Sequence, residues 1–131
     1  MAPRPKQRVV ENAVSKQKQK HRVFENAAFL RLLHDASAKQ RSQLIKTASK
    51  DQVLSVCECV FNVIKKNIIP SPSQTAKLRT KRKVAYMIAD KSVPLSEKRI
   101  ILEQNGGFIP ALIAPLIGTV LAGAVEHFLG K

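Results

Sequence analysis

The sequence of 131 residues has no tryptophan, one tyrosine and only two cysteines. Single-stranded nucleic acids stack on aromatic side chains, so this scarcity argues against that mode of binding. Cys57 and Cys59 lie two residues apart in a helical pattern and project to nearly opposite sides, which suits neither a disulfide framework nor a zinc site. We therefore expect a reducing compartment and no bound metal.

Side chains that could carry out catalysis are also sparse. The three histidines (His21, His34 and His127) are far apart in the sequence, and no glycine-rich phosphate loop precedes a helix. The N-terminal stretch Met1–Arg22 is polar and charged rather than apolar, so it does not predict a signal peptide. We expect a protein that is not an enzyme and that uses no cofactor.

Acidic residues are few: nine Asp and Glu stand against 23 Lys and Arg, which gives a net charge of +14. This charge exceeds what solubility requires and predicts a polyanionic partner, first nucleic acid and second an anionic membrane. It is unevenly placed, with +6 on residues 1–22, +5 on residues 68–105 and none on residues 106–131. The distribution predicts a flexible basic arm (1–22), a basic helical domain (23–105) and an apolar C-terminal segment containing Gly and Pro (106–131).

The alternation of apolar and polar residues that marks a β-strand is absent, and apolar residues recur with helical spacing. We predict an all-α protein: a small bundle of four to five helices, with the basic arm before it and an apolar helix at its C-terminal end. Ser49 and Gln52 form a capping-box pattern before a strongly apolar helix, and Ser71 and Gln74 form another. The predicted helical segments are 21–47 (one bent helix or two short ones), the stretch after Ser49, Pro72–Asp90 and Leu95–Gln104.

A basic cluster lies on the third of these segments. Five of the seven residues from Lys77 to Lys83 are Lys or Arg, and no acid occurs between Glu58 and Asp90 to neutralise them. Guanidinium and ammonium groups on one helix predict contacts with the phosphates of double-stranded DNA rather than with its bases. A helix-turn-helix over residues 72–104, with DKSVP as its turn, is an alternative. The predicted contact residues, including an extension onto the next helix, are Lys77, Arg79, Lys81, Arg82, Lys83, Lys98 and Arg99.

The stretch Gly106–Val125 contains no charged residue. Pro115 lacks an N–H group and would interrupt a helix, so we expect regular helix only from about Pro115 onward, too short to span a bilayer. A core helix, an interfacial membrane hairpin and docking onto a partner all stay open. Small residues at 118, 119, 122 and 123 would permit close packing in a homo-oligomer. The predicted docking side chains are Phe108, Ile109, Leu112, Ile113, Leu116 and Ile117.

Three segments occur in a characteristic order: AKQRSQLIKTAS, VCECVFNVIKKNIIPSPSQTAKLRTKRK and KSVPLSEKRIILEQNGGFIPALIAPLIG. In this order the chain resembles small basic proteins of Maverick/Polinton elements and the related adintoviruses. The resemblance implies a virion-associated protein in virions and the host nucleus, with a layout like adenovirus core and membrane-active minor proteins. Lysine predominates here, whereas adenovirus core peptides are richer in arginine, and a helical domain intervenes. Genome condensation is therefore a weaker implication than virion association.

These observations together predict a structural or core protein of a virus-like particle that binds DNA without sequence preference. Its apolar C-terminus is expected to dock on a membrane or on capsid proteins. One alternative is a membrane-active protein of lytic or penetration function, whose basic surface serves anionic lipid. Another is a regulator that reads DNA sequence with the helices between Pro72 and Gln104.

Overall fold

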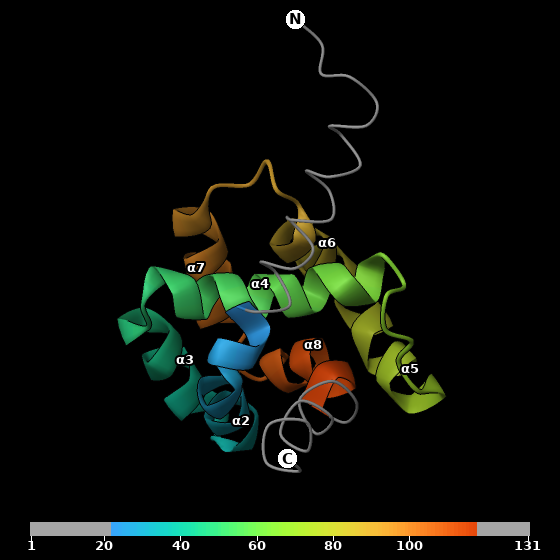
Figure 1. Ribbon diagram of the computed structural model, residues 1–131, viewed down its shortest axis with the longest axis horizontal. Helices are drawn as coiled ribbons and strands as arrows, with labels where there is room; N and C mark the ends of the chain where they lie inside the picture. Colours follow the sequence, from blue (N-terminus) through green and yellow to red (C-terminus); the bar gives the residue numbers. More distant parts are fainter. Residues whose placement is uncertain (1–21, 118–131) are drawn as a thin grey trace, which may run out of the picture.

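The structure, a computed structural model, describes residues 22–117, and within that range it contains helices and no strand (Figure 1). This confirms the all-α class. After a helical turn at residues 22–25, the helices are α2 (Ala27–Asp35), α3 (Ala38–Thr47), α4 (Lys50–Ile64), α5 (Pro72–Thr80), α6 (Arg82–Ala89), α7 (Leu95–Gln104) and α8 (Ile109–Leu116). These seven helices exceed the predicted four to five because two of the predicted segments are each divided.

Serine capping boxes begin three of the helices. Ser37, Ser49 and Ser71 each accept a hydrogen bond from the backbone N–H of the glutamine three residues later, and that glutamine's side chain bonds back. Two of these caps were predicted, at Ser49 and Ser71, and are confirmed. The third, at Ser37, divides the segment 21–47 into α2 and α3 because it fixes a new helix start just after Ala36.

The predicted single helix Pro72–Asp90 is wrong. Lys81 has φ −133° and ψ 52°, outside helical values, and separates α5 from α6. The two halves pack on different neighbours: α6 lies against α4, where Ala85 and Ile88 are buried, and α5 lies against α8. The chain turns at Lys81 because one straight helix could not reach both partners.

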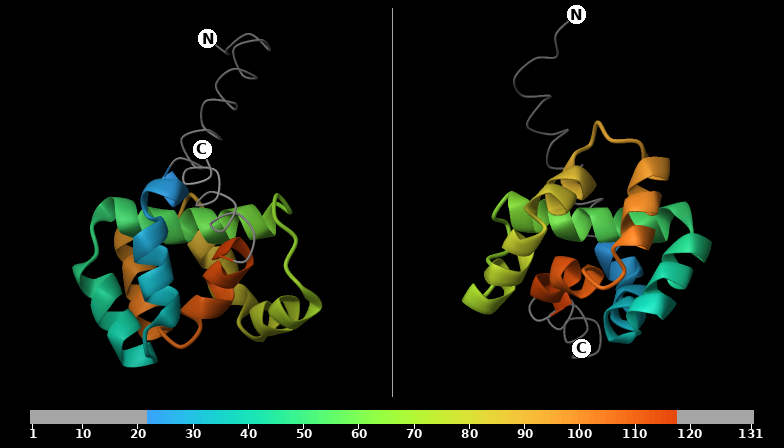
Figure 2. Two further views of the ribbon diagram at one scale, coloured as in Figure 1. Left: turned by 60° about the horizontal axis from the view of Figure 1, so that its bottom comes forward. Right: turned by 180° about the vertical axis from the view of Figure 1, so that it is seen from behind.

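Helix α8 is a core element. It lies beneath α4 and packs against α2, α4 and α5 (Figures 1 and 2). The expectation that regular helix would begin near Pro115 is wrong, since α8 begins at Ile109 and includes Pro115 one residue before its end. Pro110 lies in the first turn, where a missing N–H costs nothing. Residues 106–117 therefore belong to the helical domain. The domain extends past the boundary that the sequence predicted at residue 105.

Gly106 explains why α7 and α8 can join so close to α3. A Cβ atom at this position would lie 2.6 Å from the Ala38 carbonyl oxygen and 2.7 Å from Ser42 Oγ. Its φ is not positive, so the absence of a side chain matters here, not unusual backbone geometry. Ser42 Oγ also donates to the Glu103 carbonyl at 2.7 Å, which holds α3 against the end of α7.

Candidate nucleic-acid interface

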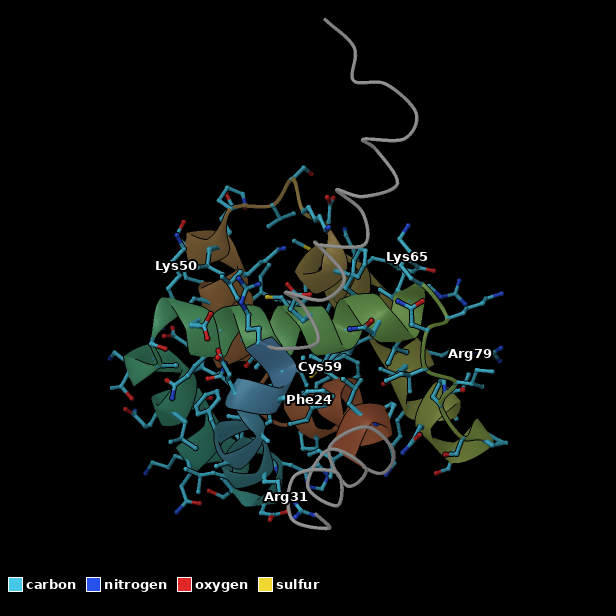
Figure 3. The ribbon with its side chains drawn as sticks, viewed as in Figure 1. Phe24, Arg31, Lys50, Cys59, Lys65 and Arg79 are labelled. Atoms are coloured by element: carbon cyan, nitrogen blue, oxygen red, sulfur yellow. The ribbon has the colours of Figure 1, made fainter. Side chains whose placement is uncertain are left out.

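One end of the molecule carries most of the domain's charge. It consists of the C-terminal part of α4, the connection 65–71, α5 and α6, and we call it the basic end (Figure 1). Residues 59–89 contain seven Lys or Arg and no acid, whereas the other described residues contain nine Lys or Arg and seven acids. Figure 3 shows Arg79 and Lys65 at this end and Lys50 at the opposite one. The net positive charge of the described residues is thus concentrated at one end of the domain.

Four of the predicted contact residues, Lys77, Arg79, Arg82 and Lys83, are exposed on α5 and α6. Their side chains form no hydrogen bond or ion pair with any other residue of the range 22–117. Exposed charges without an acidic partner repel one another, and this repulsion is relieved when a polyanion binds. These four side chains are therefore available for contact with phosphate.

Lys81 is exposed too, but its ammonium group is engaged. It donates a hydrogen bond to Asn105 Oδ1 at 2.8 Å, and its Nζ lies 5.9 Å from the centre of the Phe108 ring. These contacts fix the α5–α6 junction against the turn between α7 and α8. Lys81 thus supports the fold as well as adding charge.

The basic end contains a groove of about 570 Å³ between α4, the connection 65–71, α5 and α6. Its wall is largely apolar, with Val60, Ile64, Leu78 and Leu112 among the lining residues. Lys66, Arg79 and Arg82 also line it, so cations from three elements converge here. Tyr86 and Ile69, which are 55% and 84% exposed, border the same groove.

Lys66 was not among the predicted contact residues. Its φ of 61° is left-handed, a conformation that glycine adopts at little cost and that other residues adopt at roughly 1 kcal/mol. One sequence signal could have indicated this conformation: the pair Lys65–Lys66 directly follows an apolar helix, at a position where a glycine often ends a helix. Sequence spacing alone could not show that the loop returns toward α5.

The predicted extension of this surface to α7 is not supported by the geometry. Lys98 is only 6% exposed and lies at the other side of α6 from the groove, facing α4. Arg99 donates from Nη1 to the carbonyl oxygens of Ile45 at 2.7 Å and Ala48 at 2.8 Å. It thereby satisfies carbonyl groups at the C-terminal end of α3, where a cation is favoured. Neither side chain is placed for contact with a phosphate of a duplex.

The predicted docking residues lie inside the protein. Phe108, Ile109, Leu112, Ile113 and Leu116 are buried among α2, α4 and α5, and Ile117 is partly buried. Helices of residues 22–117 are all too short or too polar to cross a membrane. Three interpretations were left open for the segment 106–131: a core helix, a membrane hairpin and docking onto a partner. Residues 106–117, the part that the structure describes, contain the core helix α8. The predicted small-residue pairs at 118–123 lie outside the described residues.

The two cysteines are free and buried in α4. Burial raises the pKa of the Cys57 thiol to about 11 and raises the pKa of Cys59 as well, so both are neutral thiols. In the described range, no group of His, Cys, Asp and Glu side chains is arranged to hold a metal ion.

Comparison of the chain with protein-family models, curated proteins and solved structures found no match.

Proposed function

We propose that this protein is a non-enzymatic structural protein that binds double-stranded DNA without sequence preference, through phosphate contacts at its basic end. The observation that carries the proposal is the gathering of seven Lys and Arg and no acid on residues 59–89, most of them exposed and without a partner. Double-stranded DNA presents one negative charge per roughly 1.7 Å of its axis. A cluster of cations over two short helices and a loop can meet several phosphates at once.

Two features favour phosphate contacts over reading of bases. Helix α5 has nine residues and α6 has eight, so each is about 13 Å long or less, and they meet at an angle at Lys81. In the sequence-reading alternative, α7 would be the recognition helix of a helix-turn-helix. However, the cationic side chains of α7 at positions 98 and 99 are buried or bonded to carbonyl groups. This arrangement leaves α7 without free cations to enter a major groove.

A place in virions and in the host nucleus is part of the same proposal, and its support is the resemblance of the chain's segments to Maverick/Polinton and adintovirus proteins. Genome binding by the basic end would give such a protein its role in the particle. Capsid proteins, a membrane or a second copy of the chain would then be contacted by parts of the chain outside residues 22–117. Sedimentation of particles with and without nuclease would show whether the protein leaves with the DNA.

The second candidate is a membrane-active protein, and the observation that favours it is the apolar groove bordered by cations, which also suits anionic lipid. The burial of α8 weighs against it, because that helix would have to leave the core to enter a bilayer. Liposome flotation and DNA binding, measured on one preparation, separate the two candidates.

The direct test of DNA binding is its salt dependence. Fluorescence anisotropy with several unrelated duplexes should give similar affinities, falling by about a hundredfold or more from about 50 to 200 mM salt, as expected when several phosphates are contacted. A marked preference for one sequence that persists at high salt would contradict the proposal and favour the regulator. Flotation with anionic liposomes and no DNA binding would favour the membrane-active protein.

A further inference from the structure

A second cavity, of about 460 Å³, lies between α4, the end of α6 and the start of α7. The connection 90–94, an arch above α4 in the right-hand view of Figure 2, contributes Lys91, Val93 and Pro94 to its wall. Ser92 stabilises this arch by donating from its backbone N–H to Asp90 Oδ1 at 2.9 Å. Apolar side chains make up much of the wall, but four charged residues also line the cavity: Arg22, Glu58, Lys91 and Lys98.

Glu58 is a buried carboxylate of which only one oxygen has a hydrogen-bond partner in the described range. The residue is 9% exposed, and its Oε1 accepts a hydrogen bond from Arg22 Nη1 at 2.8 Å. Its Oε2 is buried and has no hydrogen-bond partner among residues 22–117. Arg22 is held in place from its other side, since its Nε donates to Asp51 Oδ1 at 2.9 Å. A buried carboxylate oxygen without a hydrogen-bond donor costs free energy, so a ligand that donates to this atom would be stabilised.

Lys98 is a buried cation whose ammonium group lacks a hydrogen-bond acceptor in the described part of the chain. Although it is 6% exposed, its ammonium group makes no hydrogen bond or ion pair with any residue of the range 22–117. Lys91, on the arch, has its Nζ 4.7 Å from the centre of the Phe61 ring, which also lines the cavity. The cavity therefore combines three cations with one carboxylate, and it needs both an acceptor for Lys98 and a donor for Glu58.

We propose that this cavity binds a phosphate group that still carries a proton, either inorganic phosphate or a phosphate monoester. Its unprotonated oxygens would accept hydrogen bonds from Lys98, Lys91 and Arg22, and its P–OH would donate to Glu58 Oε2. The charges around the cavity nearly balance, because Asp51 is bonded to Arg22 and Asp90 lies on the arch, so the ligand is identified by the donor and acceptor without partners in the described range rather than by net charge. Internal phosphates of DNA are diesters without a P–OH group, so this site is independent of the DNA contacts proposed for the basic end.

The titration behaviour of the surrounding groups agrees with such a shared proton. Burial raises the pKa of Glu58, and this effect exceeds the opposing influence of Arg22, Lys91 and Lys98. A carboxyl group of raised pKa can share a proton with phosphate, whose monoesters have a second pKa of about 6. The Cys57 thiol also faces the cavity and stays neutral because its pKa is about 11.

The test is a titration of the full-length protein, followed by two-dimensional amide NMR, with inorganic phosphate and with sulfate. Sulfate resembles phosphate in size but has no proton to donate. Phosphate should bind about tenfold more tightly than sulfate, the worth of one hydrogen bond to a charged group, and should shift amides of residues 57–61 and 90–98. Equal affinities for the two anions, or shifts confined to α5 and α6, would overturn the proposal.

Two variants distinguish the roles of the buried charges. Lys98→Met removes the ammonium group while keeping most of the unbranched apolar chain, and it should lower phosphate affinity about tenfold or more. Glu58→Gln can donate from its amide, so it should bind sulfate about as well as phosphate and abolish the preference. A preference that survives Glu58→Gln would contradict the proposed P–OH contact. Lys46→Gln, which is exposed on α3 and lines neither the cavity nor the groove of the basic end, is the matched control and should leave phosphate binding unchanged.

A nucleoside 5′-monophosphate, titrated in the same way, identifies the source of the phosphate. Affinity above that of inorganic phosphate, with added shifts at Phe61 and Val93 on the cavity wall, would assign the site to an ester. Equal or weaker affinity would assign it to free phosphate. Duplex binding by the basic end is measured separately and should not compete with phosphate at low concentration, so failure of one proposal leaves the other testable.

Discussion

The cations on the two sides of this domain have the same chemistry but different surroundings. Arg41 and Arg99 lie where α3 meets its neighbours, and both donate to backbone carbonyl groups at helix ends. Arg41 bonds to the Leu33 and His34 carbonyls at 2.8 and 3.0 Å, at the end of α2. Arg79 and Arg82 at the basic end have no partner in the described part of the chain. Among these arginines, a position next to carbonyl groups at helix ends, rather than local charge density, decides which ones are structural.

The largest expected effect concerns the buried face of α8. Replacing Ile113 and Leu116 with Asp puts two carboxylates where both side chains are at most 1% exposed. Each should cost several kcal/mol, and together they should exceed the roughly 5 kcal/mol at which a marginally stable domain unfolds. Circular dichroism should show loss of the cooperative thermal transition, and DNA binding should be lost with the fold.

The matched control places the same charges on the surface, at Leu32 and Ile100, which are 56% and 52% exposed. This variant should melt as the unchanged protein does. If the α8 variant kept its cooperative transition and lost only liposome binding, α8 would be a membrane element and not part of the core.

The next effect tests the close approach at Gly106. Gly106→Ala would force a methyl group to within 3 Å of the Ala38 carbonyl oxygen, so α3 and α7 must separate. We expect a loss of about 3 kcal/mol in the free energy of unfolding, measured by urea denaturation. Gly107→Ala, with no atom within 4 Å of the added Cβ, should change stability by less than about 0.5 kcal/mol. Equal losses in the free energy of unfolding at the two glycines would contradict the steric explanation, because backbone flexibility of the turn would then account for both.

The comparison between bonded and unbonded cations can be measured directly. Arg99→Met leaves the Ala48 carbonyl without its donor and the Ile45 carbonyl with only the Ala48 backbone N–H, and it should cost about 2 kcal/mol in stability. Arg79→Met removes the same charge from an exposed site and should change stability by less than about 0.5 kcal/mol. For DNA affinity the order should reverse. Similar stability losses for both variants would contradict the distinction.

The smallest effect is a pH dependence at Glu58. Burial raises the pKa of Glu58 in the folded state, so the folded protein favours its protonated form. This contribution to stability is present below the unfolded-state pKa of about 4.3 and is lost as the pH rises through the higher folded-state value. Glu58→Gln should remove that loss. Asp51 has a lowered pKa and changes stability in the opposite sense, so only the difference between the two proteins is informative.

Urea unfolding of both proteins, from about pH 4 to pH 7, provides this difference. If the variant lost relative stability as the pH rose, the ion pair with Arg22 would outweigh the desolvation of Glu58.

The helices that the sequence revealed best are those with their own start signals. The serine caps at Ser49 and Ser71 depend only on neighbouring residues, and α7 matches its predicted bounds Leu95–Gln104. The break at Lys81 was missed because it results from packing of α5 and α6 on separate partners. The entry of α8 into the core was left open because apolar composition does not distinguish burial in protein from burial in lipid.

Part of the candidate interface could likewise be predicted. The run from Lys77 to Lys83 has no nearby acid, and its exposed members are those the sequence indicated. Lys98 and Arg99 were assigned to the same surface because they are cations on the following helix. Their true surroundings depend on residues 40 and 54 positions away, Glu58 and Ile45, which no local pattern links to them.

The central claim is that DNA binds at the basic end because of where its cations lie, and not because of net charge alone. It is tested most directly by two variants that lose the same charge. One replaces Lys66, Arg79 and Arg82, which line the groove, with Gln. The other replaces Arg31, Lys46 and Lys50, which are exposed away from the basic end, with Gln.

Anisotropy titrations of both variants with one duplex, at several salt concentrations, give the affinity and the salt slope. The groove variant should bind at least tenfold more weakly, with its slope reduced by roughly 2 to 3, while the second variant should differ little from the unchanged protein. Equal losses of affinity and slope in the two variants would contradict the claim, because binding would then follow net charge wherever it lies.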